Sequence, residues 1–233
     1  MTEAEWQRCS DSRQMMDFLR VHASNRKLRL LAVAFCRSVS SLIHEDRSNE
    51  AMRVLEQFAD RQASQSRLKA CRDQFRLNPP TLTGIWGISL DALLTVQAAI
   101  QPRAWHAAKE SATCAVNSLS FAAIQGQSEE DLAVRRSRRA VASRLERANQ
   151  AGLVREMFGN PFCPVAHNPG WLTVTAVGLA EAIYTNRAFD RLPILADALE
   201  DAGCTTRDIL DHCRQPGDHV RGCWVVDLVL GKS

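Results

Sequence analysis

The residues best suited to chemistry gather near the end of the chain, where thiol and imidazole side chains recur at short intervals: Cys204, His212, Cys213, His219 and Cys223. Cys163 and His167, earlier in the chain, could lie near them in the fold. Zinc binds thiolate and imidazole ligands in a tetrahedron. The spacing Cys213-x5-His219-x3-Cys223, around the turn that Pro216-Gly217 predicts, supplies three such ligands. One hypothesis is therefore a structural zinc site formed by Cys204, Cys213, His219 and Cys223.

The competing interpretation of these residues is ordinary packing. Structural zinc sites usually contain two closely spaced ligand pairs, and the sequence has no Cys-x-x-Cys. A free cysteine often behaves as a small hydrophobe, so Cys204 and Cys213 would pack against the last helix. His219 would then cap a helix or bond a loop carbonyl, and the chain would need no cofactor.

Support for catalysis is weak. Cys213 or Cys223 could act as a nucleophile activated by His212 or His219. Adjacent helical residues point about 100° apart, however, so His212 and Cys213 are poorly placed to share a proton. The chain also lacks a phosphate-binding glycine loop, a dinucleotide motif, His-Glu-x-x-His and Gly-x-Ser-x-Gly. We predict no catalytic residue and do not expect an enzyme.

A run of arginines marks a second candidate site: Arg135, Arg136, Arg138, Arg139, Arg144 and Arg147. They follow an acidic helix start at 128–131, which predicts one helix over 129–157. Clustered arginines can bind nucleic-acid phosphates or an acidic protein. The arginines surround the helix, however, and nearby acids could pair with them, so a solvated face is a third interpretation.

Composition is that of an ordinary globular protein. The chain has 233 residues, 45% of them hydrophobic and 24% charged, with a net charge of +3 and a mean hydropathy of -0.21. The sequence shows neither an apolar run of membrane-spanning length nor a signal-peptide pattern. Eight scattered cysteines and no Asn-x-Ser/Thr site favour a reducing compartment. We therefore expect a cytoplasmic protein with no membrane contact.

The hydrophobic pattern is helical almost throughout. Apolar residues recur at intervals of three and four, and segments open with a capping residue such as Ser24, Ser64, Thr173 or Asp190. Thr205 and Asp208 predict one more capping box. We predict an all-α fold of nine or ten helices, packed as antiparallel hairpins.

The best internal boundary is the proline-rich segment 78–84, which must end the helix before it. It suggests an N-terminal helical subdomain, 1–77, and a helical body, 85–233, within one compact unit. We also expect a long ordered loop at 158–172, held to the body by its aromatic residues. The final segment, 223–231, fits a short buried helix better than a strand.

Both ends of the chain resemble an uncharacterised family that is common in planctomycete genomes. The resemblance rests on residues 1–6, on 25–30 with Cys36-Arg37, and above all on 189–204, 212–214 and 219–228, which form the C-terminal signature of the family. It covers both ends well and the middle, about 65–155, poorly. The resemblance implies a bacterial protein and no particular activity.

Two functional hypotheses follow. The first is a non-catalytic helical module that binds an unidentified protein partner or has a regulatory role, because packed helix hairpins present grooves to partner helices. The alternative is a structural-zinc protein that binds nucleic acid through the arginine-rich helix 129–157.

Overall fold

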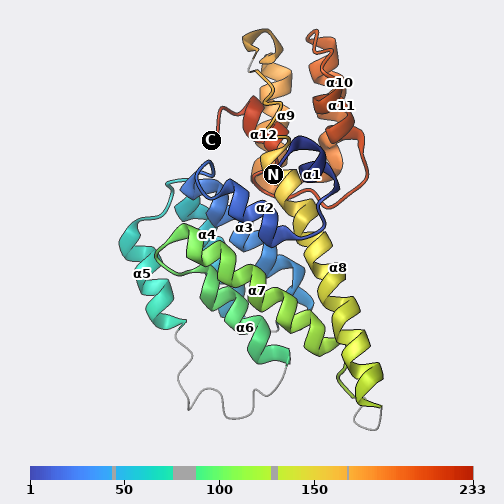
Figure 1. Ribbon diagram of the computed structural model, residues 1–233. Helices are drawn as coiled ribbons and strands as arrows, with labels where there is room; N and C mark the ends of the chain where they lie inside the picture. The colour runs from blue at the N-terminus through green and yellow to red at the C-terminus, as the bar shows by residue number, and fades with distance from the viewer. Residues whose placement is uncertain (44–45, 76–87, 127–130, 167, 233) are drawn as a thin grey trace. The chain divides into compact units, whose positions relative to one another are not determined.

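The computed structural model describes residues 1–43, 46–75, 88–126, 131–166 and 168–232. This part of the chain contains twelve α-helices and no strand, which confirms the all-α prediction (Figure 1). None of these helices is both long and apolar enough to cross a membrane. By their internal contacts the residues form two compact units, Glu3–Val154 and Arg155–Ser233, called the N-terminal and C-terminal units below.

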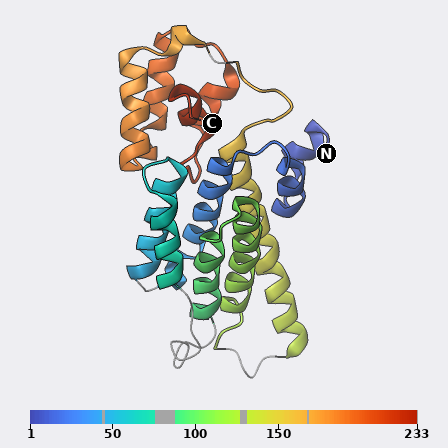
Figure 2. The ribbon, with the colours of Figure 1, turned by 90° about the vertical axis from the view of Figure 1, so that its left-hand side faces the viewer.

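The N-terminal unit contains seven helices and most of an eighth: α1 (Glu3–Arg8), α2 (Ser12–Leu19), α3 (Asn25–Ser38), α4 (Asp46–Ala59), α5 (Gln65–Gln74), α6 (Ile88–Ala99), α7 (Ala104–Ala122) and α8 (Leu132–Phe158). Helix α3 is central, because it packs against α4, α6 and α7. Helices α6 and α7 form an antiparallel hairpin (Figure 2). Buried alanines of α7, such as Ala107 and Ala115, leave room for neighbouring helices to approach closely.

The proline-rich segment lies outside the described residues, but the helices on either side of it belong to one unit. Helix α3, before the segment, packs against α6 and α7, after it. The compact units divide instead between Val154 and Arg155, within α8. The division into 1–77 and 85–233 stays a prediction. The contacts of α3 show that prolines can end a helix without separating the core that the flanking helices share.

Arg29 shows how tightly that core is built. It lies within α3 and is only 4% exposed, although arginine is usually found at the surface. Its guanidinium donates to the carbonyls of Ala99, Gln101 and Pro102, where α6 ends. Carbonyls at a helix C-terminus have no partner within the helix, so this arginine supplies donors that α6 lacks. Burial lowers the pKa of Arg29 to about 10.

The C-terminal unit begins with the end of α8 and adds α9 (Val174–Asn186), α10 (Leu192–Asp201), α11 (Arg207–Arg214) and α12 (Trp224–Val229). Its core contains Ile183, Leu195, Leu199 and Val225 among other residues. The segment 158–172 has a 3-10 turn, Pro169–Trp171, and Trp171 and Leu172 pack against this core. His167, within this segment, lies outside the described residues.

The predicted caps have mixed outcomes. Ser24, Ser64 and Thr173 each accept a backbone N–H at the start of a helix, as predicted. The cap at Asp190 is wrong: a 3-10 turn, Phe189–Arg191, leads into α10, whose early Pro193 has no N–H to satisfy. The Thr205 cap is also wrong, because α11 has Thr206 at its N-cap without a side-chain bond.

Candidate metal centre

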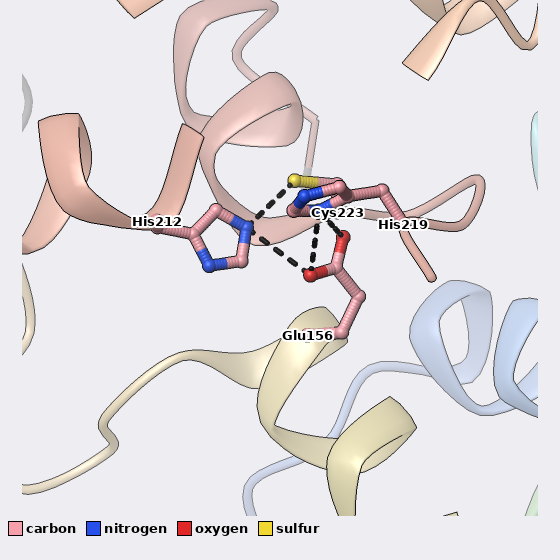
Figure 3. A group of neighbouring side chains, drawn as sticks. All are labelled: Glu156, His212, His219 and Cys223. Atoms are coloured by element: carbon pink, nitrogen blue, oxygen red, sulfur yellow. Dashed lines mark hydrogen bonds and ion pairs between the residues drawn. The ribbon is translucent and has the colours of Figure 1, made fainter. Parts of the chain in front are cut away.

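Four buried side chains of the C-terminal unit converge on one point: Glu156, His212, His219 and Cys223 (Figure 3). Each offers a potential ligand atom, and these atoms all lie within 4.8 Å of one another. Among the residues that the structure describes, no other group of three or more His, Cys, Asp or Glu side chains meets this test. We call these residues the Glu156 cluster.

The cluster depends on the ends of three helices. Glu156 is in the last turn of α8, His212 is near the end of α11, and Cys223 is the N-cap of α12. His219 comes from the connection between α11 and α12. Gly222, just before Cys223, has a φ of 98°, a conformation that favours glycine. The sharp turn there starts α12 directly after the cysteine.

A close backbone approach fixes the end of α8 against α12. Gly159, the residue after α8, has a φ of 62°, and a Cβ atom on it would lie 3.1 Å from the Trp224 ring. The same ring lies 5.2 Å, between centroids, from the ring of His212. Trp224, the residue after Cys223, thus packs against Gly159 at the end of α8 and against the imidazole of His212.

The hydrogen bonds of the cluster centre on the carboxylate of Glu156. Nδ1 of His219 lies 3.0 Å from Oε2 and 3.1 Å from Oε1 of Glu156. Nε2 of His212 lies 3.2 Å from Oε2 of the same carboxylate and 3.2 Å from Sγ of Cys223. A single N–H on Nε2 cannot point fully at both acceptors. A cation between the four groups would contact all of them at once.

Gln215 holds the outer nitrogen of both imidazoles. Its side-chain amide lies 3.3 Å from Nδ1 of His212, and its backbone carbonyl lies 3.4 Å from Nε2 of His219. Histidines that bind metal usually donate their second N–H to an acceptor, which fixes the ring and its tautomer. The Gln215 carbonyl beside His219 is such an acceptor. Beside His212 lies the amide nitrogen, a donor, so the Gln215 amide would have to turn its oxygen toward Nδ1 in the metal-bound form. The nitrogens left to face the centre are Nε2 of His212 and Nδ1 of His219.

Burial and charge oppose each other at this site. The side chains of Glu156 and His219 are each 7% exposed. Burial by itself would raise the pKa of Glu156, but hydrogen bonds from His212 and His219 lower it to about 2. Burial would lower the pKa of His219, but the hydrogen bond and charge of Glu156 raise it above the ordinary value. Burial raises the pKa of the Cys223 thiol well above its usual range, and the charge of Glu156 adds to this effect.

The geometry fits a small tetrahedral cation. Zinc bonds of about 2.0–2.3 Å to nitrogen, oxygen and sulfur place neighbouring ligand atoms about 3.3–3.6 Å apart. The bonded pairs in the cluster are separated by 3.0–3.2 Å, slightly inside that range, and the other pairs of ligand atoms lie up to 4.8 Å apart, so binding would require small side-chain shifts. Two imidazoles, a thiol and a carboxylate form a donor set for zinc, whereas magnesium and calcium prefer oxygen ligands alone.

The sequence identified only part of this set. His219 and Cys223 lie in the cluster, whereas Cys204 and Cys213 lie in the hydrophobic core of the unit. Burial raises the pKa of Cys213 to about 12, as expected for a neutral packed thiol. Cys163 is exposed, and His167 is outside the described residues.

Two members, His212 and Glu156, were absent from the proposed ligand set. His212 stood among the nearby candidates, but Glu156 was missed altogether. The signal for Glu156 was its position between Val154 and Met157, both buried, at the end of a helix. A carboxylate on such an apolar face needs a partner inside the protein.

The six arginines occupy a different place. All of them lie on the part of α8 that belongs to the N-terminal unit, so none is in the Glu156 cluster. Arg139 stacks over the ring of Phe121 at 4.1 Å from its centroid. Arg136, Arg138 and Arg144 are exposed, and Arg135 and Arg147 are partly buried. The arginines therefore do not line a single face.

Comparison with known proteins gives no independent assignment. No protein-family model, curated protein or solved structure matches the chain significantly.

Proposed function

We propose that this chain is a structural-zinc protein in which one zinc ion ties together the C-terminal unit. The ligands are the Glu156 carboxylate, Nε2 of His212, Nδ1 of His219 and the thiolate of Cys223. The single observation that supports this most is the convergence of the four ligand atoms within 4.8 Å at a buried point.

The arrangement favours a structural rather than a catalytic role. A catalytic zinc ion has three protein ligands and leaves one position for water or substrate, whereas a structural zinc ion has four. The Glu156 cluster supplies four ligands, and none of their side chains is more than 9% exposed. The ion would link Glu156, at the end of α8, to His212, His219 and Cys223, which are more than fifty residues farther along the chain.

Metal binding also resolves the conflict between burial and charge. Without a cation, the negative charge of Glu156 depends on hydrogen bonds from the two nearby imidazoles, and burial keeps Cys223 a neutral thiol. A divalent cation stabilises the carboxylate and the thiolate together, and the thiol proton is released to solvent on binding. We therefore expect the metal-loaded state to be the stable folded form of this unit.

The test uses the tag-free full chain, with zinc measured by native mass spectrometry and by elemental analysis. The informative pair is Cys223→Ala and Cys213→Ala, because both cysteines are buried in the same unit and only Cys223 is in the cluster. We expect one zinc per wild-type chain, one in Cys213→Ala, and at least a hundredfold loss of affinity in Cys223→Ala.

A wild-type chain that stays metal-free in micromolar zinc would overturn the proposal. So would equal zinc affinity in the two variants. Far-ultraviolet circular dichroism of both variants, taken with excess zinc, separates loss of a ligand from loss of the fold.

A further inference from the structure

The first half of α8 exposes aliphatic side chains on the face turned away from the core. Val134 is 44% exposed, Val141 50% and Leu145 65%. At 100° per residue these three positions fall within about 40° of one another around the helix axis. We call them the α8 stripe. It extends over twelve residues, and its first and last residues are about 16 Å apart along the helix.

The opposite side of α8 holds the helix to its own unit. Glu146 accepts a hydrogen bond from Ser38 of α3, and Gln150 accepts one from Ser12 and donates to the carbonyl of Ala112. These two positions lie about 140° around the helix from the stripe. The stripe is therefore not the edge of the face that packs on α3 and α7.

The charge beside the stripe is positive. Arg138 and Arg144, both exposed, lie on its two sides. Residues 1–154, from which the N-terminal unit is built, hold 22 Lys and Arg against 16 Asp and Glu. An apolar strip between cations matches a helix that carries leucines or similar residues on one face and acids beside them.

Other occupants fit less well. A second copy of the chain would place Arg138 and Arg144 against the same arginines, and like charges at an interface are costly. Nucleic acid would use the arginines but would cover the aliphatic stripe with phosphates, which gain nothing from it. Single-stranded nucleic acid also calls for aromatic residues on which bases can stack, and the stripe has none.

We propose that the first half of α8 is a docking surface for an acidic amphipathic helix of a partner protein. Apolar contact along Val134, Val141 and Leu145 provides affinity, and the flanking arginines select acids and reject basic helices. This proposal is independent of the zinc ion, because the stripe and the Glu156 cluster belong to different units.

The probe is a synthetic helical peptide of three heptads with leucines on one face and glutamates elsewhere. Its controls are a scrambled peptide of the same composition and a version with lysine in place of every glutamate. Binding to the full chain is measured by fluorescence anisotropy at two salt concentrations. We expect the acidic amphipathic peptide to bind at least tenfold more tightly than either control.

Variants place the binding site. Val141→Gln combined with Leu145→Gln should weaken binding at least tenfold, and both positions are exposed enough for the fold to tolerate the change. Ile194→Gln is the matched control, because Ile194 is an exposed aliphatic residue, 52% exposed, on α10 of the other unit. It should leave the affinity unchanged, as should chelation of metal.

Three results would overturn the proposal. One is equal binding of the acidic and scrambled peptides to the wild-type chain. Another is equal affinity of the acidic peptide for the Val141→Gln/Leu145→Gln double variant and for the Ile194→Gln control. The third is evidence for a different occupant. Duplex DNA or RNA could bind more tightly than the acidic peptide, with an affinity that the double variant does not change, or sedimentation could show a dimer of the chain that the double variant abolishes. Either form of this third result would assign α8 to nucleic acid or to self-association.

Discussion

Two buried carboxylates on the same helix have very different surroundings. Glu146, in the N-terminal unit, is 5% exposed and accepts hydrogen bonds from Ser38, Asn149 and Gln150. Glu156, ten residues later in the C-terminal unit, is 7% exposed and faces two imidazoles with a thiol nearby. Both carboxylates accept hydrogen bonds, but only Glu156 lies next to side chains that could bind a metal ion with it.

The two carboxylates differ in the chemistry that is open to the groups that donate hydrogen bonds to them. Hydroxyl and amide groups such as those around Glu146 satisfy a carboxylate and have little further chemistry in that position. Imidazole and thiol groups can instead give up their protons and bind a transition metal. Burial alone therefore does not identify a functional acid, and the chemical type of its neighbours does.

Removal of metal should have the largest effect on this comparison. Because zinc would cross-link four separate points of the C-terminal unit, we expect excess chelator to destabilise that unit by several kcal/mol, as for structural zinc sites in general. The polar network around Glu146 should not respond. Hydrogen exchange measures the two units separately. After chelation, amides of α11 and α12 should lose protection, and those of α3 and α7 should keep it. Equal loss in both units would contradict the comparison.

Matched substitutions of the two carboxylates should come next. Glu156→Gln removes a ligand charge, and we expect zinc affinity to fall by at least a factor of 100. Glu146→Gln should leave zinc affinity unchanged and cost about 1–3 kcal/mol of stability, the usual size for disruption of a buried hydrogen-bonded group. Competition with a chromophoric chelator gives the affinities, and urea unfolding gives the stabilities. A loss of zinc in Glu146→Gln would show that the two sites are coupled.

The outer contacts of the histidines should have a smaller effect. Gln215→Ala removes the amide beside His212 but keeps the backbone carbonyl beside His219. Loss of such a partner typically reduces metal affinity by 10–100-fold, and we expect a value near the lower end because only one of the two contacts is lost. Gln125→Ala, at an exposed glutamine after α7, is the control. An unchanged affinity in Gln215→Ala would mean that packing alone orients the rings.

The smallest effect should be the pH dependence of the metal-free protein. The lowered pKa of Glu156 contributes stability above pH 4.5, which is lost as the pH falls toward 2. The raised pKa of His219 contributes stability below pH 6.5, which is lost as the pH rises through its raised value. Chelator-treated protein should thus gain most from this pair between pH 4.5 and 6.5.

Bound zinc should remove the loss of stability that the metal-free protein shows as the pH rises above 6.5. Protons compete with the metal for the histidines and the cysteine, so the zinc-loaded protein should not lose stability between pH 6.5 and 8. Thermal unfolding of both forms across this range makes the comparison. Parallel profiles with and without zinc would contradict binding at the Glu156 cluster.

Local features of the sequence determined the secondary structure well. The helical repeat of apolar residues predicted an all-α protein, and the caps at Ser24, Ser64 and Thr173 are confirmed. The final helix was also correctly preferred over a strand, and Gly231 follows it with a φ of 61°. These features could be predicted because helix periodicity and capping depend on residues a few positions apart.

Only the tertiary structure decided which helices share a core and which side chains meet. Nothing in the local sequence shows that α3 packs against α6 and α7, which follow the proline-rich segment in the chain. Nor does it show that Glu156 at the end of α8 faces His212 and Cys223. Spacing along the chain favoured Cys204 and Cys213, but the turn of α11 directs Cys213 into the core and leaves His212 at the cluster. Side chains that meet across fifty or more residues are set by how the helices pack, and the short-range periodicity of a sequence carries little information about that packing.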